Sequence, residues 1–127
     1  MFSEKQKLVD YCRAVSGVLL DSFADQKHKF KLIRVLYERT YPFVFFCEEK
    51  DIDDGNIHPQ LAYTSRNMLN YSNGKYGLES EDTFNFRTAQ LIERLAQFIS
   101  QQTISLEEDI LLKNKWKKLS NEIYSID

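Results

Sequence analysis

The densest group of side chains that could do chemistry lies between residues 48 and 58. Carboxylate oxygens are the ligands that Ca²⁺ and Mg²⁺ prefer, so the segment is a candidate EF-hand loop. Gly55 and Ile57 fit positions six and eight of such a loop, but positions one, three and twelve then fall on Lys50, Ile52 and Leu61. Because none of those three side chains supplies an oxygen ligand, an EF-hand is excluded, and an irregular cation site remains an alternative. The acids and the histidine of the segment are Glu48, Glu49, Asp51, Asp53, Asp54 and His58.

The other residues with catalytic or metal-binding chemistry are few and widely spaced. Cys12, His28, Cys47 and His58 are potential zinc ligands, but no two of them have the short spacing that prepares a zinc site. The chain has four glycines, and neither a phosphate-binding glycine loop nor a nucleophile elbow is present. We therefore predict no catalytic residues, no cofactor and no enzymatic activity. A small enzyme or metal-binding protein built on the carboxylate-rich loop 48–58 remains the alternative.

Basic residues gather in two short segments. Such residues bind nucleic acid when aromatic rings are interleaved with them. However, the chain carries 17 lysines and arginines against 19 acids, and a net charge of −2 gives no general attraction to a polyanion. The favoured interpretation is two solvated helix faces, and weak nucleic-acid binding is the second alternative. The two segments contain Lys27, Lys29, Lys31 and Arg34, and then Lys113, Lys115, Trp116, Lys117 and Lys118.

Helices must position all of these residues. The chain has 127 residues, which fits one domain, and its four glycines and two prolines are too few for the turns of a β-sandwich. Apolar residues repeat at steps of three and four over about residues 8–23, 30–40, 61–69, 84–99 and 112–123. Ser3 with Gln6, and Ser105 with Glu108, have the spacing of helix capping boxes. The sequence predicts a single all-α domain over residues 1–127, a bundle of about five to six helices.

Two segments allow a second interpretation. Pro42 disfavours the helical conformation of Tyr41, so the second helix should stop or kink there. The apolar run at 42–47 fits a short strand or a buried helical turn, and the lack of a strong partner strand favours the helix. The dipeptide Asn73-Gly74 favours a small hairpin near 71–76, but Gly74 can also end a helix in the left-handed conformation.

The N-terminal segment does not resemble a secretory signal. Charges at Glu4, Lys5, Lys7 and Asp10 interrupt it. The longest apolar run, 42–47, is far shorter than the roughly 20 residues that span a bilayer. We expect a cytoplasmic protein with no membrane partner, in which Cys12 and Cys47 are free thiols.

Aromatic residues are the remaining functional signal. Phe, Tyr and Trp make up 13% of the chain, and several tyrosines fall near the ends of predicted helices. Exposed tyrosines are typical of protein-binding surfaces, although a buried ring with its hydroxyl in water is an equally good interpretation. An acidic loop next to such rings suits a partner with a basic surface.

The profile of a short, single-domain, near-neutral chain without catalytic motifs favours a non-catalytic protein-binding module. Within that class we favour a small inhibitor, an immunity protein or an antitoxin-like protein, because an acidic loop can block a basic cleft. The identity of the partner and the oligomeric state are left open. The predicted contact residues are Glu48, Glu49, Asp51, Asp53, Asp54, Tyr63, Tyr71 and Tyr76.

Overall fold

A computed structural model of the chain describes residues 3–125, and their side chains as far as residue 115. It contains six helices and, within those residues, no strand. The prediction of an all-α single-domain bundle is therefore confirmed, and the alternatives of a strand at 42–47 and a hairpin near 71–76 are wrong. The helices are α1 (Glu4–Leu20), α2 (Gln26–Glu49), α3 (Ile57–Arg66), α4 (Met68–Ser72), α5 (Glu81–Gln101) and α6 (Leu106–Ser125).

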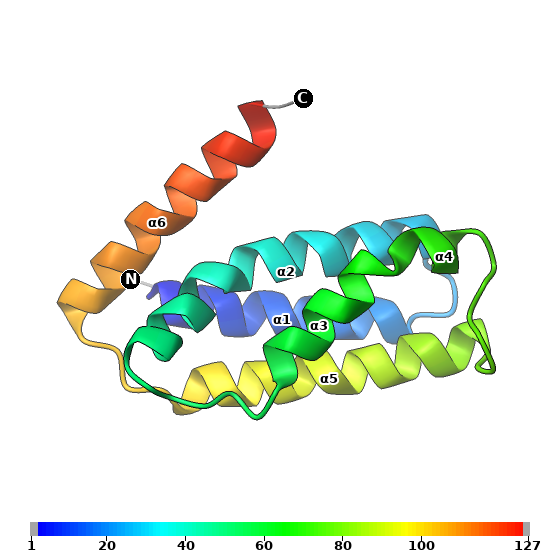
Figure 1. The fold of residues 1–127 in the computed structure, drawn as a ribbon, viewed down its shortest axis with the longest axis horizontal. Helices are drawn as coiled ribbons and strands as arrows, with labels where there is room; N and C mark the ends of the chain where they lie inside the picture. The colour runs from blue at the N-terminus through cyan, green and yellow to red at the C-terminus, as the bar shows by residue number, and fades with distance from the viewer. Residues whose placement is uncertain (1–2, 126–127) are drawn as a thin grey trace.

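Four helices form the bundle, and α6 projects from it (Figure 1). The most extensive packing is between α1 and α5, while α2 packs against α1 and α3, and α3 against α5. α6 contacts α1 and α2 near its beginning and then extends away from the other helices (Figure 1). The predicted apolar and basic positions of its second half, from Trp116 onward, lie outside the described side chains.

The predicted apolar stripes are the buried faces of the bundle helices. Full burial of one large apolar side chain contributes about 1.5–3 kcal/mol to stability. Phe23 is an exception: it is 97% exposed, because α1 ends at Leu20 and Phe23 lies in the turn before α2. The core includes Cys12, Leu19, Ile33, Phe43, Cys47, Leu61, Phe84, Ile92 and Leu95, and both cysteines are free thiols.

α2 runs through Pro42 without ending there. The sequence predicted that the helix stops or kinks at Pro42, and the stop is wrong, because the helix continues to Glu49. A proline inside a helix costs about 3 kcal/mol, but Phe43, Phe46 and Cys47 on the following turn are buried in the core. At about 1.5–3 kcal/mol for each large apolar side chain, this burial offsets the cost of the proline.

Serine side chains cap the beginnings of α1, α5 and α6. The Ser3 and Ser80 side chains accept hydrogen bonds from the N–H groups of Gln6 and Thr83, at 3.0 and 3.1 Å. Ser105 and Glu108 form the predicted capping box, with two reciprocal bonds of 3.2 Å. Gly74, at φ +78°, follows α4 in the left-handed conformation that the sequence predicted for it.

Candidate functional site

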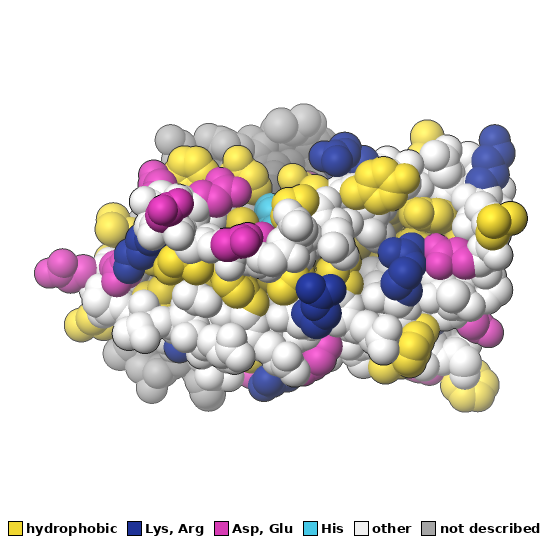
Figure 2. Space-filling view, turned by 60° about the horizontal axis from the view of Figure 1, so that its bottom comes forward, with side chains coloured by type: hydrophobic (Ala, Val, Ile, Leu, Met, Phe, Trp, Pro, Cys, Tyr) yellow, Lys and Arg dark blue, Asp and Glu magenta, His cyan; other side chains and the backbone are white. Residues whose placement is uncertain are grey.

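The five carboxylates of the predicted site lie together where α2 ends. Glu48 and Glu49 belong to the last turn of α2, and Asp51, Asp53 and Asp54 lie in the loop that leads to α3. All of them are exposed except Asp54, which is partly buried. Figure 2 shows acidic side chains gathered at one end of the molecule, next to hydrophobic ones. We call these five residues the acidic end.

The charges in the first and last turns of α2 oppose the dipole of the helix, although the capping residues Asp25 and Lys50 complement it. A helix C-terminus favours cations and an N-terminus favours anions, by about 0.3–1 kcal/mol for each exposed charge at low salt. The last turn of α2 contains Glu48 and Glu49 and no base, while the first turn contains Lys27 and Lys29 and no acid. Local rules of stability are broken most often at functional sites. The placement of the two glutamates therefore favours a role other than folding.

Two aspartates of the acidic end hold the shape of their own loop. The N–H of Gly55 donates to Asp53 Oδ1 at 2.9 Å. Asp54 accepts from Asn56 N–H through Oδ1 and from His58 N–H through Oδ2, both at 3.0 Å. The second of these bonds satisfies an N–H in the first turn of α3, which otherwise has no helical partner. Asp54 is therefore a structural residue. Asp53 accepts its hydrogen bond through a single oxygen, and an asparagine at this position could accept the same bond through its amide oxygen.

The other three carboxylates have no internal role of this kind. Within the described residues, the side-chain carboxylates of Glu48, Glu49 and Asp51 accept no hydrogen bond and form no ion pair. The one base of the segment, Lys50, forms its ion pair with Glu108 at the beginning of α6. The acidic end thus presents negative charge to the solvent, and no cation of the described residues neutralises it.

The acidic end is not arranged like a metal site. Among the described residues, no three His, Cys, Asp or Glu side chains lie close enough together to hold a metal ion. Four of the five carboxylates, all except Glu49, instead border a hollow of about 330 Å³, whose wall is completed by Val44, Ile52, Asn56 and Pro59. A hollow with apolar walls and acidic edges fits the stem and charged head of a lysine or arginine side chain.

A row of aromatic rings precedes the acidic end on α2. Tyr37, Tyr41 and Phe45 follow one another at intervals of four residues, and the rings of Tyr41 and Phe45 are stacked with centroids 6.4 Å apart. Tyr41 is 46% exposed and Phe45 is 41% exposed. We call these three residues the aromatic row. The aromatic row is absent from the contact residues predicted from the sequence, although its spacing of four residues on one helix is visible there.

His58 of α3 packs against the aromatic row. Its ring stacks on Tyr37 with centroids 5.0 Å apart and also lies against Tyr41. Only 7% of the residue is exposed, and Nε2 has no hydrogen-bond partner among the described residues. Burial lowers the pKa of His58 below its usual value, and this outweighs the opposite effect of Asp54. His58 is therefore neutral at pH 7 and acts as a packing residue.

The three predicted tyrosines do not lie together. Tyr63 on α3 is 60% exposed and fits a contact role. Tyr71 and Tyr76 are only partly exposed, and their rings pack around Phe84, Tyr71 at 4.3 Å and Tyr76 at 5.9 Å between centroids. They lie by α4 and the start of α5, at the other end of the bundle from the acidic end (Figure 1). The structure thus separates Tyr71 and Tyr76 from the five carboxylates.

Three of the four bases of the predicted strip on α2 lie beside an apolar groove, whereas Lys29 is buried, so the prediction of a solvated face is wrong for that residue. Lys27, Lys31 and Arg34 border it, and Phe30, Met68 and Leu69 form its floor between α2 and α4. Arg34 is paired with Glu38 at 3.6 Å. The second basic segment lies largely outside the described side chains, so the structure adds nothing to the nucleic-acid alternative there.

Comparisons with known proteins returned no relative: no protein-family model, no curated protein and no solved structure matches this chain. Among the described residues, none of the helices has the length and apolar character that crossing a membrane requires. The function must therefore be inferred from the geometry of the acidic end and of its neighbours on α2 and α3.

Proposed function

We propose that the chain is a non-catalytic protein-binding module that docks a partner with a basic surface. The docking surface consists of the acidic end together with the exposed rings of Tyr41, Phe45 and Tyr63. The observation that carries the proposal is the placement of Glu48 and Glu49, which oppose the dipole of α2 and have no ion-pair partner among the described residues. Charges that disfavour the folded helix are best explained by an interaction outside the chain.

The surface has the composition of a protein interface. Aromatic rings are enriched at the centres of interfaces and charged groups lie at their rims. The half-exposed rings of Tyr41 and Phe45 can be buried by a partner, while Glu48, Asp51 and Asp53 surround a hollow that accepts a basic side chain. A stable complex of this kind covers about 800 Å² on each partner.

Negative charge at one end of the molecule also guides the encounter. Acidic clusters raise the association rate with a basic partner, and the gain falls steeply as salt increases. A partner whose functional cleft is basic would be blocked when the acidic end enters it. This is the basis on which we propose an inhibitor, an immunity protein or an antitoxin-like protein, acting from within the cytoplasm.

The test uses three baits in affinity capture from the host cell. The first is the wild-type protein, and the second is Glu48→Gln/Glu49→Gln/Asp51→Asn/Asp53→Asn, which keeps the structural Asp54. The third is a control with the same change of charge on exposed residues elsewhere, Asp10→Asn/Asp21→Asn/Asp25→Asn/Asp82→Asn.

We expect one stoichiometric partner on the wild-type and control baits, and a loss of at least tenfold on the acidic-end variant. Such a loss is what the removal of several steering and contact charges produces. If the partner stays bound equally to the acidic-end variant and the control, the acidic end is not the docking surface. Circular dichroism of the three baits checks that all are folded.

A further inference from the structure

The groove between α2 and α4 lies apart from the acidic end and has the opposite charge. It measures about 560 Å³, and its lining residues come from the first half of α2 and from α4. A cavity of roughly 150 Å³ holds one benzene ring, so this groove has room for roughly three side chains of that size. At a rise of about 1.5 Å per residue, Lys31 and Glu48 lie about 25 Å apart along α2. A short segment bound in the groove therefore leaves the acidic end accessible.

The floor of the groove is apolar. On the side of α2, the buried Phe30 packs edge-on against Phe84 with ring centroids 5.8 Å apart, so this side is fixed by the core. On the side of α4, Leu69 is 73% exposed, and no residue of this short helix is buried. A partner that covers these apolar side chains removes them from water, which is favourable. The floor therefore suits an apolar occupant.

The edge of the groove is positively charged. Its lining residues include three bases and no acid. Arg34 pairs with Glu38 at 3.6 Å, whereas the exposed Lys27 and Lys31 form no ion pair with any described residue. Because Lys27 and Lys31 are four residues apart on α2, they lie on the same side of the helix. The other acids near this end of the bundle lie outside the lining of the groove; they are Asp21, Asp25, Glu79, Glu81 and Asp82.

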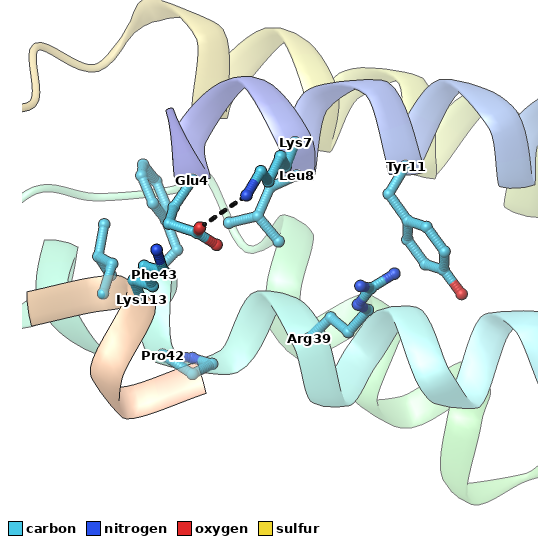
Figure 3. Close-up of a pocket in the computed structure, with 9 residues that line it drawn as sticks. Glu4, Lys7, Leu8, Tyr11, Arg39, Pro42, Phe43 and Lys113 are labelled. Carbon is cyan, nitrogen blue, oxygen red and sulfur yellow. Dashed lines mark hydrogen bonds and ion pairs between the residues drawn. The ribbon is translucent and has the colours of Figure 1, made fainter. Parts of the chain in front are cut away.

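Two of the three bases around a second cavity, beside α6, already have partners within the chain. This cavity of about 210 Å³ lies between α1, α2 and the first turns of α6 (Figure 3). Lys7 pairs there with Glu4 at 3.2 Å, and the guanidinium carbon of Arg39 lies 4.2 Å from the centroid of the Tyr11 ring. The Asp109 carboxylate, which accepts from the N–H of Glu4 at 2.8 Å, adds negative charge. The groove between α2 and α4 differs, because its lining contains no acid and two of its bases have no partner in the described part of the chain.

We propose that the groove docks an acidic amphipathic helix of a partner protein. Such helices bind apolar grooves through side chains at positions i, i+3, i+4 and i+7. The apolar side chains of the helix lie on Phe30, Met68 and Leu69, and its acidic side chains reach Lys27 and Lys31. The concave shape favours a helix over a membrane, because a flat bilayer surface does not fill a groove. The apolar floor favours a protein over a nucleic acid, because a phosphate backbone is attracted by charge and gains nothing from apolar contacts.

The first test is an NMR titration of the full chain with three synthetic peptides of about 12 residues at constant ionic strength. The first peptide has leucines at helical spacings of three and four and glutamates elsewhere. The second has glutamine in place of each glutamate, and the third has the composition of the first in an order that gives no apolar face. We expect saturable shifts at Phe30, Met68 and Leu69 with the first peptide, at a Kd of roughly 0.1 mM, and binding at least tenfold weaker for the other two. The proposal is overturned if either control peptide binds equally well, or if the shifts fall outside the groove.

A matched pair of charge variants tests the edge of the groove. Lys27→Gln/Lys31→Gln should weaken binding of the acidic peptide at least tenfold. Arg94→Gln/Lys113→Gln removes the same charge from exposed positions of α5 and α6 and should leave the affinity within about twofold. Equal affinities for the two variants would contradict the proposed role of the lysines.

A second matched pair tests the floor. Leu69→Gln should weaken the acidic peptide at least fivefold, because it removes an apolar contact from the centre of the docking surface. Leu106→Gln, at a position of α6 that is 78% exposed, should leave the affinity unchanged. Both leucines are on the surface, so both variants should fold, and equal affinities would contradict the site.

Other occupants of the groove are tested with the same variants. The probes are vesicles of phosphatidylcholine with phosphatidylserine and a random-sequence DNA duplex, and sedimentation of the chain alone measures self-association. The proposal is overturned if the acidic peptide does not bind while either polyanion binds through Lys27 and Lys31. It is also overturned if the chain dimerises and Leu69→Gln abolishes the dimer. None of the substituted residues belongs to the acidic end, so failure of this proposal is distinguishable from failure of the proposed docking function.

Discussion

The two ends of the bundle use aromatic residues in different ways. At the end formed by α4 and the start of α5, Tyr71 and Tyr76 pack around the buried Phe84, and the Tyr76 hydroxyl donates to Glu81 at 3.2 Å. At the other end, Tyr41 and Phe45 remain half exposed beside carboxylates that have no ion-pair partner among the described residues. The two ends therefore differ in the pairing of their polar groups within the chain more than in residue type, and this difference distinguishes the structural cluster from the proposed docking surface.

The same contrast extends to the charged residues. Arg87 at the first end forms a two-pronged pair with Glu79, with bonds of 2.7 and 3.2 Å, and its guanidinium lies over the Phe84 ring. At the acidic end the corresponding carboxylates face the solvent. We therefore expect substitutions at the first end to change stability, and substitutions at the acidic end to change binding.

The largest expected effect is the loss of the buried ring at the α4–α5 end. Phe84→Ala should lower the free energy of unfolding by about 3–5 kcal/mol, because it leaves a cavity in the core. Phe45→Ala, at a half-exposed position of the aromatic row, should cost less than about 1 kcal/mol. Urea unfolding measures both. If Phe84→Ala does not fold, Phe84→Leu provides the comparison. A loss of stability in Phe45→Ala equal to that in Phe84→Leu would contradict the proposed difference between the two ends.

A pH-dependent effect is expected at the acidic end because of His58. Its pKa is lowered in the folded protein, so the unfolded chain binds the proton more readily. His58 therefore contributes to the free energy of unfolding, and this contribution is fully present above the usual histidine pKa of about 6.5. It is lost as the pH falls from there toward the lower pKa of His58 in the folded protein. Stability should therefore decrease between about pH 7 and 5, where most carboxylates remain charged.

The variant His58→Phe keeps a ring against Tyr37 and removes the titrating group. We expect it to flatten the decrease in stability between about pH 7 and 5, while His28→Gln, at an exposed position of α2, leaves the decrease in place. Chemical unfolding at a series of pH values measures this. A decrease that persists unchanged in His58→Phe would mean that another group causes it.

A smaller loss of stability is expected where α6 is anchored. Asp109 accepts from the N–H groups of Glu4 and Lys5 and thereby caps α1 from a helix far along the chain. Asp109→Ala should cost about 1 kcal/mol, the usual effect of removing a cap. Asp10→Ala, at an exposed position of α1, should change stability by less than about 0.5 kcal/mol. Equal unfolding midpoints for the two variants would show that Asp109 does not anchor α6.

The smallest effect on stability is expected from the acidic end itself. The variant Glu48→Gln/Glu49→Gln/Asp51→Asn/Asp53→Asn should leave the free energy of unfolding unchanged or raise it by up to about 1 kcal/mol, because two of the charges oppose the dipole of α2. Thermal unfolding at low salt is the appropriate measurement, since salt screens the effect. A clear loss of stability would show that these carboxylates support the fold.

Much of the fold could be predicted because it depends on local patterns. Apolar steps of three and four placed the helices, and the spacing of Ser105 and Glu108 placed a cap. The effect of Pro42 could not be predicted in the same way. Its consequence depends on whether Phe43 and Phe46 find a core, which is decided by helices distant in the sequence.

The site could be predicted only in part for a similar reason. The five carboxylates are neighbours in the sequence and stay neighbours in the fold, so composition was sufficient to group them. Tyr71 and Tyr76 do not lie beside these carboxylates, because the direction of α3 and α4 carries them to the other end of the bundle. The cavity beside α6 requires side chains from three helices, and no local pattern indicates it.

The most direct test of the central claim is the rate of association with the captured partner, measured by stopped flow over a range of salt concentrations. For the wild-type protein and the charge-matched control, we expect a rate that falls steeply with salt. For the acidic-end variant, we expect a rate at least tenfold lower at low salt, with little dependence on salt. Equal rates and equal salt dependence for the acidic-end variant and the control would contradict the claim that the acidic end is the docking surface.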